Sequence, residues 1–469
     1  MNQNKTQEIN QRMLVLEMLL TENVYSHRLV RDVLNKYNYL SQQEKAFIKR
    51  LYEGTLERQI ELDYVIDLYS KVKTKQMKRP IRAIMRMGVY QIMYMDAVPD
   101  AAACNEAVKL AQKKGFAALK GFVNGVLRNI ARNKDEIAYT SLSVKYSMPE
   151  WIVDLWMAQL GEETTKIVLA GLLREHSVTV RFRDISGNTG IDMETAVSAV
   201  QKALTAQGGT MERHAYLPCA YKVSGTDDLA RLPYYKEGAF VVQDVSSMLA
   251  VAAVGIEDYV KHAKSEGGCE AVRVLDLCAA PGGKSMLVAD LLEKCNVDYE
   301  ILSRDVSAGK VALMQENLDR CGLRNVSVGV GDAVQRDEAL VGTVDIVIAD
   351  VPCSGLGVIG KKRDIKYRIT PETVEELTVL QRQILTVAVS YLKPGGRLLF
   401  STCTINRKEN EDNFAWLRDE RKLVPMPLDN MLPECLCTDT AKQGYLQLLP
   451  GVHDTDGFFI SVFYAHGHP

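Results

Sequence analysis

The sequence predicts an α/β protein in which residues 266–469 form a doubly wound, mostly parallel sheet. Apolar segments alternate with helix-patterned segments from about residue 271 onward. Most of these apolar segments are continuous, as expected for strands that helices cover on both faces. Residues 1–140 are instead patterned as helix almost throughout, and residues 141–265 mix both patterns. We therefore expect an all-α domain, a small α+β connector and the α/β domain, in that order.

Five apolar segments predict the strands of the sheet, and three segments between them predict helices. Thr370 suits the N-cap of the last helix and Pro371 its first position, where a missing N–H costs no hydrogen bond. The predicted strands are residues 272–277, 300–304, 326–330, 344–349 and 397–401, and the predicted helices are residues 285–294, 307–321 and 371–391.

The all-α region carries apolar side chains at helical spacing. Pro80 suits the first turn of one helix, and Gly88 on its apolar face would let a neighbouring helix approach closely. The two apolar stripes are Ile81, Ile84, Met85, Gly88 and Ile92 on one helix and Val123, Val126, Leu127 and Ile130 on another. In the connector, a helix is expected to open near Tyr146, residues 178–183 alternate like a strand, and residues 262–268 predict a surface loop.

The net charge of −2 by itself argues against a nucleic-acid-binding protein, but the charge is unevenly distributed. Residues 1–140 hold 23 Lys and Arg against 15 Asp and Glu, a net charge of +8, which leaves −10 for the remainder. A basic segment of this kind suits contact with phosphate, and a solvated helix face is the alternative.

No apolar run approaches the ~20 residues that cross a bilayer, and the polar N-terminus lacks the apolar core of a secretion signal. We expect a cytoplasmic protein whose ten cysteines are reduced. Cys435 and Cys437 are not accompanied by a second pair at zinc-ligand spacing, so no metal site is expected.

The first predicted strand ends in Asp276-Leu-Cys-Ala-Ala-Pro-Gly-Gly-Lys-Ser. The small residues of this loop let the backbone approach a ligand closely before the next helix begins. A phosphate loop would need glycine at position 278, where Cys278 stands, so a nucleotide triphosphatase is excluded. Asp305 follows the second strand, where a carboxylate can accept both ribose hydroxyls, and Asp332 follows the third, where it could accept from an adenine amino group. Together they favour an adenosyl ligand.

Two cysteines follow later strands, Cys353 after Asp350-Val-Pro and Cys403 after Ser401-Thr. A thiolate that adds to carbon 6 of a cytosine makes carbon 5 nucleophilic enough to take a methyl group from a sulfonium. Asp350 could act as the acid near ring nitrogen 3, and a second thiol could assist the later loss of the carbon-5 proton and of the first thiol. An ordinary thiol has a pKa of ~8.5, so its surroundings must activate it.

The helical region resembles the RNA-binding fold of the antitermination factor NusB. The matching fragments are Leu51-Tyr-Glu-Gly, Arg86-Met-Gly-Val-Tyr-Gln, Val98-Pro, Asn105-Glu-Ala-Val and Phe122-Val-Asn-Gly-Val-Leu-Arg.

The rest of the chain resembles the NOL1/NOP2/Sun family of RNA 5-methylcytosine methyltransferases. The motifs that carry the likeness are Asp276-Leu-Cys-Ala-Ala-Pro-Gly-Gly-Lys, Asp350-x-Pro-Cys-Ser-Gly-x-Gly, Ser401-Thr-Cys and His453-Asp-Thr-Asp-Gly-Phe-Phe. The resemblance implies a Rossmann-like domain that uses S-adenosylmethionine, with Cys403 as the nucleophile and Cys353 as the cysteine that helps to release the product. It implies that the cofactor is lined by Cys278, Ala279, Ala280, Pro281, Gly282, Gly283, Lys284, Asp305, Asp332 and Asp350.

Some assignments stay open at the level of sequence. The residues alone do not divide the roles of the two thiols, because Pro352-Cys353 imitates the Pro-Cys nucleophile of DNA cytosine methyltransferases. Lys284 and residues 361–364 are either substrate contacts or ordinary surface groups. The chain also departs from the family pattern at Val351, at residues 361–366 and at Thr404, where serine is frequent.

The main hypothesis is an enzyme that methylates carbon 5 of a cytosine in 16S ribosomal RNA through a covalent cysteine–cytosine adduct. Transfer RNA is the alternative substrate, and a non-catalytic RNA-binding assembly factor is the alternative from another class. We expect a monomer without a metal or a membrane partner.

Overall fold

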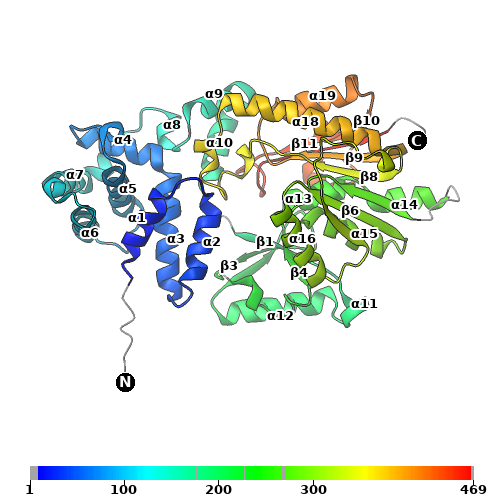
Figure 1. Cartoon of the computed structure of the whole chain (residues 1–469), viewed down its shortest axis with the longest axis horizontal. Coiled ribbons are helices and arrows are strands. Elements are labelled where there is room, and N and C mark those ends of the chain that lie inside the picture. Colours follow the sequence, from blue (N-terminus) through cyan, green and yellow to red (C-terminus); the bar gives the residue numbers. More distant parts are fainter. Residues whose placement is uncertain (1–8, 175–176, 227, 266–270, 466–469) are drawn as a thin grey trace. The chain divides into compact units, whose positions relative to one another are not determined.

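The computed structural model describes residues 9–174, 177–226, 228–265 and 271–465. The chain divides into two compact units (Figure 1). The helical unit comprises Met1–Leu173 and Ile359–Arg368, and the α/β unit comprises Arg174–Val358 and Ile369–Pro469.

The helical unit has one apolar core, to which both predicted stripes contribute. Pro80 lies in the first turn of α5, as predicted. A Cβ atom added to Gly88 would lie 2.8 Å from Leu127 of α7, which confirms the expected close approach of two helices. The helices are α1 Gln11–Leu20, α2 Ser26–Lys36, α3 Gln42–Glu57, α4 Gln59–Tyr69, α5 Arg79–Tyr94, α6 Asp100–Lys113, α7 Lys120–Asn133, α8 Leu142–Lys145, α9 Glu150–Leu160 and α10 Glu162–Leu172.

The segment Ile359–Arg368, which we call the clip, leaves the α/β unit and packs into the helical unit. Its last residues form the short helix α17, Ile365–Arg368. Asp364 accepts hydrogen bonds from the N–H and the hydroxyl of Ser26 at 3.1 and 2.6 Å. Lys366 is 1% exposed and donates to the carbonyl oxygens of Glu57 and Ser147, and burial lowers its pKa to about 7. The clip is therefore part of the core of the helical unit.

The α/β unit begins with an antiparallel sheet in the order β2-β3-β1-β4, on which α12 packs. Its β1 confirms the predicted strand at 178–183, and α9 confirms the helix expected to open near Tyr146. The prediction of a surface loop at residues 262–268 is wrong for residues 262–265, which belong to helix α14. Ile256 and Val260 of this helix are buried. Residues 266–268 lie outside the described residues. The elements are β1 Val178–Phe182, α11 Ser186–Thr189, α12 Met193–Ala206, β2 Thr210–Arg213, β3 Ala220–Ser224, β4 Phe240–Val242, α13 Val245–Ala253 and α14 Ile256–Ser265.

The large sheet has the order β10-β12-β9-β8-β5-β6-β7, with β11 paired to β12. The five predicted strands are confirmed as β5 to β9 and are mutually parallel. Strand β12 runs antiparallel to β9, and β10 and β11 each pair antiparallel with β12. The three predicted helices are confirmed as α15, α16 and α18, and Thr370 caps α18 as expected. The strands are β5 Val272–Asp276, β6 Tyr299–Asp305, β7 Val326–Val330, β8 Val344–Asp350, β9 Leu392–Thr402, β10 Val424–Pro425, β11 Tyr445–Leu448 and β12 Phe458–Tyr464.

Helices cover both faces of this sheet (Figure 1). Successive residues of each strand point to opposite faces, so Val274 joins the core under α13 to α16 while Leu275 joins the core under α18 and α19. This two-sided burial explains why the strands read as continuous apolar runs. The helices are α15 Gly283–Lys294, α16 Ala308–Arg320, α18 Pro371–Tyr391, α19 Glu411–Asp419 and α20 Asp439–Lys442. No helix among the described residues is long and apolar enough to cross a membrane.

Candidate active site

The order of the parallel strands reverses at β5, which pairs with β6 on one side and β8 on the other. In open α/β sheets, the crevice that binds ligands lies beyond the carboxyl ends of the strands at such a point. Asp276 is the last residue of β5, and the predicted site residues Asp305 and Asp350 are the last residues of β6 and β8. The topology therefore brings these three carboxylates to one edge of the sheet.

The loop after β5 is held between the two neighbouring strands. The N–H of Leu277 donates to Ile348 of β8 at 3.0 Å, and the N–H of Ala279 donates to Arg304 of β6 at 2.8 Å. Gly282 has φ of 97°, a left-handed conformation that favours glycine, and α15 begins at the next residue. The loop thus presents small residues and a helix N-terminus to the crevice.

Asp276 lies beneath this loop and is 1% exposed. Its Oδ2 accepts from Ser285 at 2.7 Å, and Ser303 donates in turn to Ser285 at 2.8 Å. Burial raises the pKa of Asp276 to about 7, and its buried Oδ1 has no hydrogen-bond partner. This carboxyl group is a structural anchor for the start of α15 with one acceptor position unfilled.

The two carboxylates predicted for an adenosyl ligand follow β6 and β7. Asp305 is buried, and it accepts from the N–H of Ser307 at 3.1 Å and from Lys310 at 3.3 Å. Asp332 is exposed and accepts from the N–H of Val334 at 3.1 Å. Both groups are acceptors at the carboxyl edge of the sheet, and both keep further lone pairs for a ligand.

Asp350 is paired with a cation. Its Oδ2 lies 2.6 Å from Nζ of Lys284, which is nearly buried, and its Oδ1 accepts from Ser401 at 2.8 Å. Strands β8 and β9 place Asp350 directly opposite Ser401. Lys284 is therefore not a surface lysine: it joins the loop after β5 to the end of β8.

The two predicted cysteines meet at the same edge. The Sγ atoms of Cys353 and Cys403 are 3.2 Å apart. The contact with Cys403 and burial raise the pKa of Cys353 well above the usual value of a thiol. Burial beside Asp276 and Asp350 also raises the pKa of Cys278, so that group is held as a thiol.

Residues that the sequence analysis did not identify hold the cysteine loops in place. Glu409 is fully buried and accepts hydrogen bonds from the N–H of Ser354 at 2.8 Å and from its hydroxyl at 2.5 Å. Ser354 also contacts Thr404 at 2.6 Å. Only the position of Ser354 and Thr404 directly after the two cysteines could have suggested this contact.

Residues 361–364, predicted as a possible substrate contact, lie in the clip. Arg363 contacts Glu53 and Glu57 at 2.6 and 2.9 Å, and Asp364 is buried against Ser26. Lys361 and Lys362 are exposed. Arg363 and Asp364 therefore belong to the helical unit.

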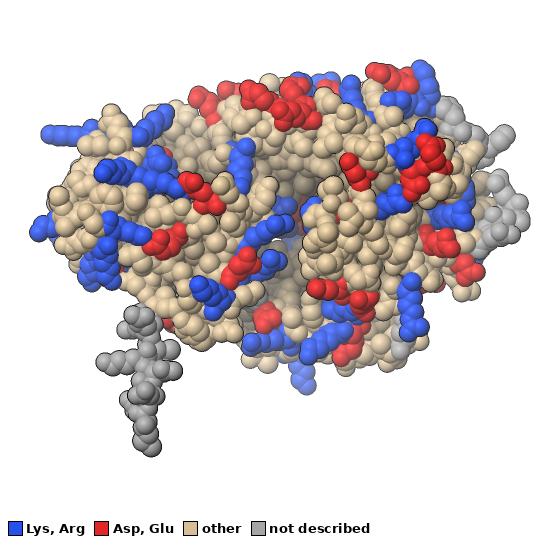
Figure 2. Space-filling model, viewed as in Figure 1, with Lys and Arg blue, Asp and Glu red and all other residues tan. Residues whose placement is uncertain are grey.

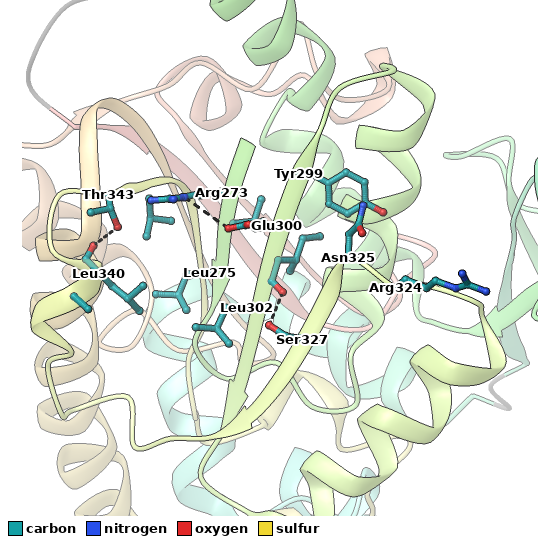
Figure 3. Close-up of a pocket in the computed structure, with 14 residues that line it drawn as sticks. Arg273, Leu275, Tyr299, Glu300, Leu302, Arg324, Asn325, Ser327, Leu340 and Thr343 are labelled. Atoms are coloured by element: carbon teal, nitrogen blue, oxygen red, sulfur yellow. Dashed lines mark hydrogen bonds and ion pairs between the residues drawn. The ribbon is translucent and has the colours of Figure 1, made fainter. Parts of the chain in front are cut away.

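A pocket of about 600 Å³ lies at the opposite, amino-terminal ends of the strands. Figure 3 shows Leu275, Leu302 and Leu340 on its floor, with Arg273 and Glu300 paired above them. The pocket exists because the connection from β7 to β8 contains only one short helical turn, Glu338–Leu340. The connection has no long helix that would cover this end of the strands. None of the predicted site residues lines it. The described residues also contain no group of three or more side chains that could hold a metal ion.

The chain is similar to known proteins over nearly its whole length. The family model for the 16S rRNA methyltransferases RsmB/F matches residues 268–464, and the model of the NusB family matches residues 9–132. A probable ribosomal RNA small subunit methyltransferase B of Bacillus subtilis is 32% identical over 446 residues, which are 93% of this chain and 94% of that protein. A relative of the same name from Synechocystis sp. is 29% identical and is matched over 97% of its length, with 96% of this chain.

Solved structures show the same fold. A methyltransferase homolog protein from Pyrococcus horikoshii matches 69% of this chain and 97% of its own with a TM-score of 0.54, at 23% sequence identity.

Proposed function

Because the chain belongs to the RsmB/F family of 16S rRNA methyltransferases, we propose that it transfers a methyl group from S-adenosylmethionine to carbon 5 of a cytosine in 16S ribosomal RNA. The observation that carries the cytosine assignment is the 3.2 Å contact between Cys353 and Cys403 at the carboxyl edge of the sheet. Methylation at carbon 5 needs a thiol that adds to the ring and a later elimination, which a second thiol can assist.

The residues at this edge fit the cofactor. Asp305 suits the ribose hydroxyls and Asp332 the adenine amino group, because both are acceptors at the ends of adjacent strands. The loop from Cys278 to Lys284 would border the rest of the molecule, and Asp276 holds the start of α15 beside it by accepting from Ser285 at 2.7 Å. When bound there, S-adenosylmethionine supplies a methyl group on a positively charged sulfur.

The protein side chains perform the covalent steps on the base. The thiolate of Cys403 adds to carbon 6, and its proton has gone to solvent. The addition moves a ring electron pair towards ring nitrogen 3, which takes a proton from solvent and returns it when the aromatic ring is restored. The carboxylate of Asp350, held by Lys284 at 2.6 Å, accepts a hydrogen bond from the N–H formed there. After methylation the C–H electron pair at carbon 5 re-forms the ring double bond and the bond between carbon 6 and sulfur breaks. Cys353 gives its proton to the departing sulfur and takes the proton from carbon 5.

The contact between the two sulfur atoms supports this division of roles, because a neutral Cys353 thiol can donate a proton to the sulfur 3.2 Å away. The family resemblance implies that Cys403 is the nucleophile.

The proposal extends to the other parts of the chain. Residues 1–140 would bind RNA through their net positive charge, residues 141–265 would connect, and residues 266–469 would carry the reaction. The nine described cysteines are free thiols, which suits a cytoplasmic protein.

A methylation assay with labelled S-adenosylmethionine and unmethylated 16S ribosomal RNA tests the function, with transfer RNA as a parallel substrate. We expect label in 5-methylcytosine of the ribosomal RNA only. Cys403→Ala should transfer no methyl group, Cys353→Ala should accumulate a denaturant-resistant protein–RNA adduct, and Cys435→Ala, at an exposed thiol, should behave as wild type. Label in transfer RNA alone, or no transfer at all, would refute the proposal, and an adduct in Cys403→Ala would reverse the two roles.

A further inference from the structure

The two cysteine loops are joined by a hydrogen-bonded chain of buried side chains. Ser354 follows Cys353 and Thr404 follows Cys403, and the two hydroxyl oxygens are 2.6 Å apart. Ser354 has one hydroxyl proton, and it donates this proton to Glu409 at 2.5 Å. The hydroxyl of Thr404 must therefore donate to Ser354. The direction of the chain is fixed, from Thr404 through Ser354 to the carboxylate.

Glu409 also receives donors from three other groups. The N–H of Ser354 donates to Oε1 at 2.8 Å, the amide of Gln381 donates to Oε1 at 3.0 Å, and the amide of Asn406 donates to Oε2 at 3.0 Å. With the Ser354 hydroxyl these make four uncharged donors around a fully buried carboxylate. A buried carboxylate is costly unless it is hydrogen-bonded, and these four donors satisfy it.

Gln381 ties the same carboxylate to the residue before Cys353. Its amide nitrogen donates both to Glu409 and to the carbonyl oxygen of Pro352 at 3.0 Å. Asn413 holds Gln381 in turn by donating to its amide oxygen at 2.9 Å. Both neighbours of Cys353 in the chain are therefore held by hydrogen bonds. Ser354 is bonded directly to Glu409, and Pro352 is linked to Glu409 through Gln381.

We propose that Glu409 is a positioning residue, whose carboxylate fixes the loop of Cys353 against the loop of Cys403 so that the Cys353 thiol reaches the covalent adduct. This inference rests on the proposed function. Glu409 acts through Ser354 and Gln381, which donate hydrogen bonds to its carboxylate. Its negative charge also contributes to the raised pKa of Cys353, which keeps that group protonated.

Glu409→Gln keeps the shape of the side chain but replaces one carboxylate oxygen, an acceptor, by an NH2 group. That NH2 group would face the N–H and O–H donors that now bind the oxygen. Loss of one hydrogen bond to a charged group corresponds to about tenfold or more in rate. We expect release of the methylated RNA to slow by about tenfold or more, with adduct formation changed less than about threefold, so that the denaturant-resistant adduct accumulates as in Cys353→Ala. Affinity for S-adenosylmethionine, measured by titration, should be unchanged.

Matched variants separate positioning from general damage. Glu376→Gln makes the same change at an exposed position of α18 and should behave as wild type. Ser354→Ala and Thr404→Val break the hydroxyl chain and should slow release as well, whereas Thr404→Ser keeps the hydroxyl and should retain release. If Glu409→Gln does not fold, as judged by its melting curve, the same comparison is made with Ser354→Ala and Thr404→Val against Thr404→Ser.

The outcomes distinguish this inference from the proposed function. If wild type forms no adduct and methylates no cytosine, the proposed function fails. If wild type is active and Cys353→Ala traps the adduct, but Glu409→Gln releases product normally or loses adduct formation and release equally, Glu409 is not a positioning residue for Cys353.

Discussion

Asp276 ends the central strand of the sheet with a carboxyl group that burial keeps close to neutrality. Its pKa is raised from 3.8 to about 7, with burial as the largest cause. Because the folded-state pKa is higher than that of the unfolded chain, the folded protein binds the proton more tightly. The stability that this group contributes is complete at low pH and is lost as the pH rises from about 4 through about 7.

Asp276→Asn should remove that pH dependence. Between about pH 5 and about pH 8 the free energy of unfolding of wild type should fall by about 2–3 kcal/mol relative to the variant. Chemical denaturation of both proteins across this range measures the difference. A constant difference would show that Asp276 is ionised in the folded state throughout.

Gly357 and Gly457 bring two backbones into direct contact at the site. The N–H of Gly457 donates to the carbonyl of Gly357 at 2.9 Å, and the N–H of Gly357 donates to the carbonyl of Cys403 at 3.1 Å. A Cβ atom on Gly357 would lie 2.0 Å from the carbonyl oxygen of Gly457. The loop after β8 therefore meets the loop before β12 where no side chain fits.

Gly357→Ala should destabilise the protein by about 3 kcal/mol or more and abolish methyl transfer, because one of the two backbones has to move. Gly309→Ala is the matched control, since a Cβ atom at that position in α16 meets nothing within 4 Å. Thermal melting and the methylation assay measure both effects. Unchanged melting of Gly357→Ala would contradict the packing described.

At the scale of elements, the clip completes the helical unit by capping one of its helices. The N-cap residue of α2, Tyr25, makes no side-chain cap hydrogen bond, and the carboxylate of Asp364 accepts from the first N–H of α2 instead. A negative charge at this end of a helix is favourable. Asp364 of the clip thus supplies the N-terminal cap of α2, a contact that in most helices comes from the residue just before the helix.

Asp364→Ala should lower the free energy of unfolding by about 1–3 kcal/mol, because it removes the cap of α2 and leaves Ser26 without these acceptors. Asp32→Ala, on the exposed face of the same helix, should change it by less than about 0.5 kcal/mol. Chemical denaturation monitored by helical circular dichroism measures both. Equal effects of the two substitutions would contradict a capping role.

The elements show what local pattern could and could not predict. Strands β5 to β9 and helix α18 follow from apolar runs and from Thr370 and Pro371, which act within a few residues. Strands β10 to β12 were not predicted, because they depend on pairing between distant segments: β12 pairs with β9, and β10 and β11 pair with β12. Within the site, the meeting of Cys353 and Cys403 follows from their places after parallel strands. Glu409 could not be predicted, since Lys408-Glu-Asn-Glu is patterned as surface and its burial depends on distant donors.

On the scale of the whole molecule, charge separates the two ends of the chain. Residues 1–140 carry a net charge of +8 and the remainder −10. Figure 2 shows Lys and Arg side chains spread over the helical unit, at the left of the view. Lys71 and Lys75, between α4 and α5, are exposed there. These lysines suit contacts to RNA phosphates, which release counterions and make binding depend on salt.

Lys71→Glu combined with Lys75→Glu should weaken RNA binding and flatten its dependence on salt. The slope of log K against log salt should fall by about 0.7 for each RNA phosphate that the protein no longer neutralises. Lys202→Glu combined with Lys236→Glu makes the same charge change at exposed positions of the α/β unit and should leave the slope nearly unchanged. Filter binding at several salt concentrations measures both, and equal slopes for the two double variants would refute a specific role of the helical unit.

The place of β12 in the sheet has a consequence for biosynthesis. This strand pairs with β9 from Phe459 to Tyr464, and Gly457 just before it closes against Gly357. Translation produces β12 after every other strand of the sheet, at about 5–20 residues per second. A nascent chain therefore holds both cysteines and the loop after β5 outside the ribosome before β12 has paired with β9. We expect a chain cut short before Phe458 to be inactive, because the loop of Gly357 then lacks its contact with Gly457.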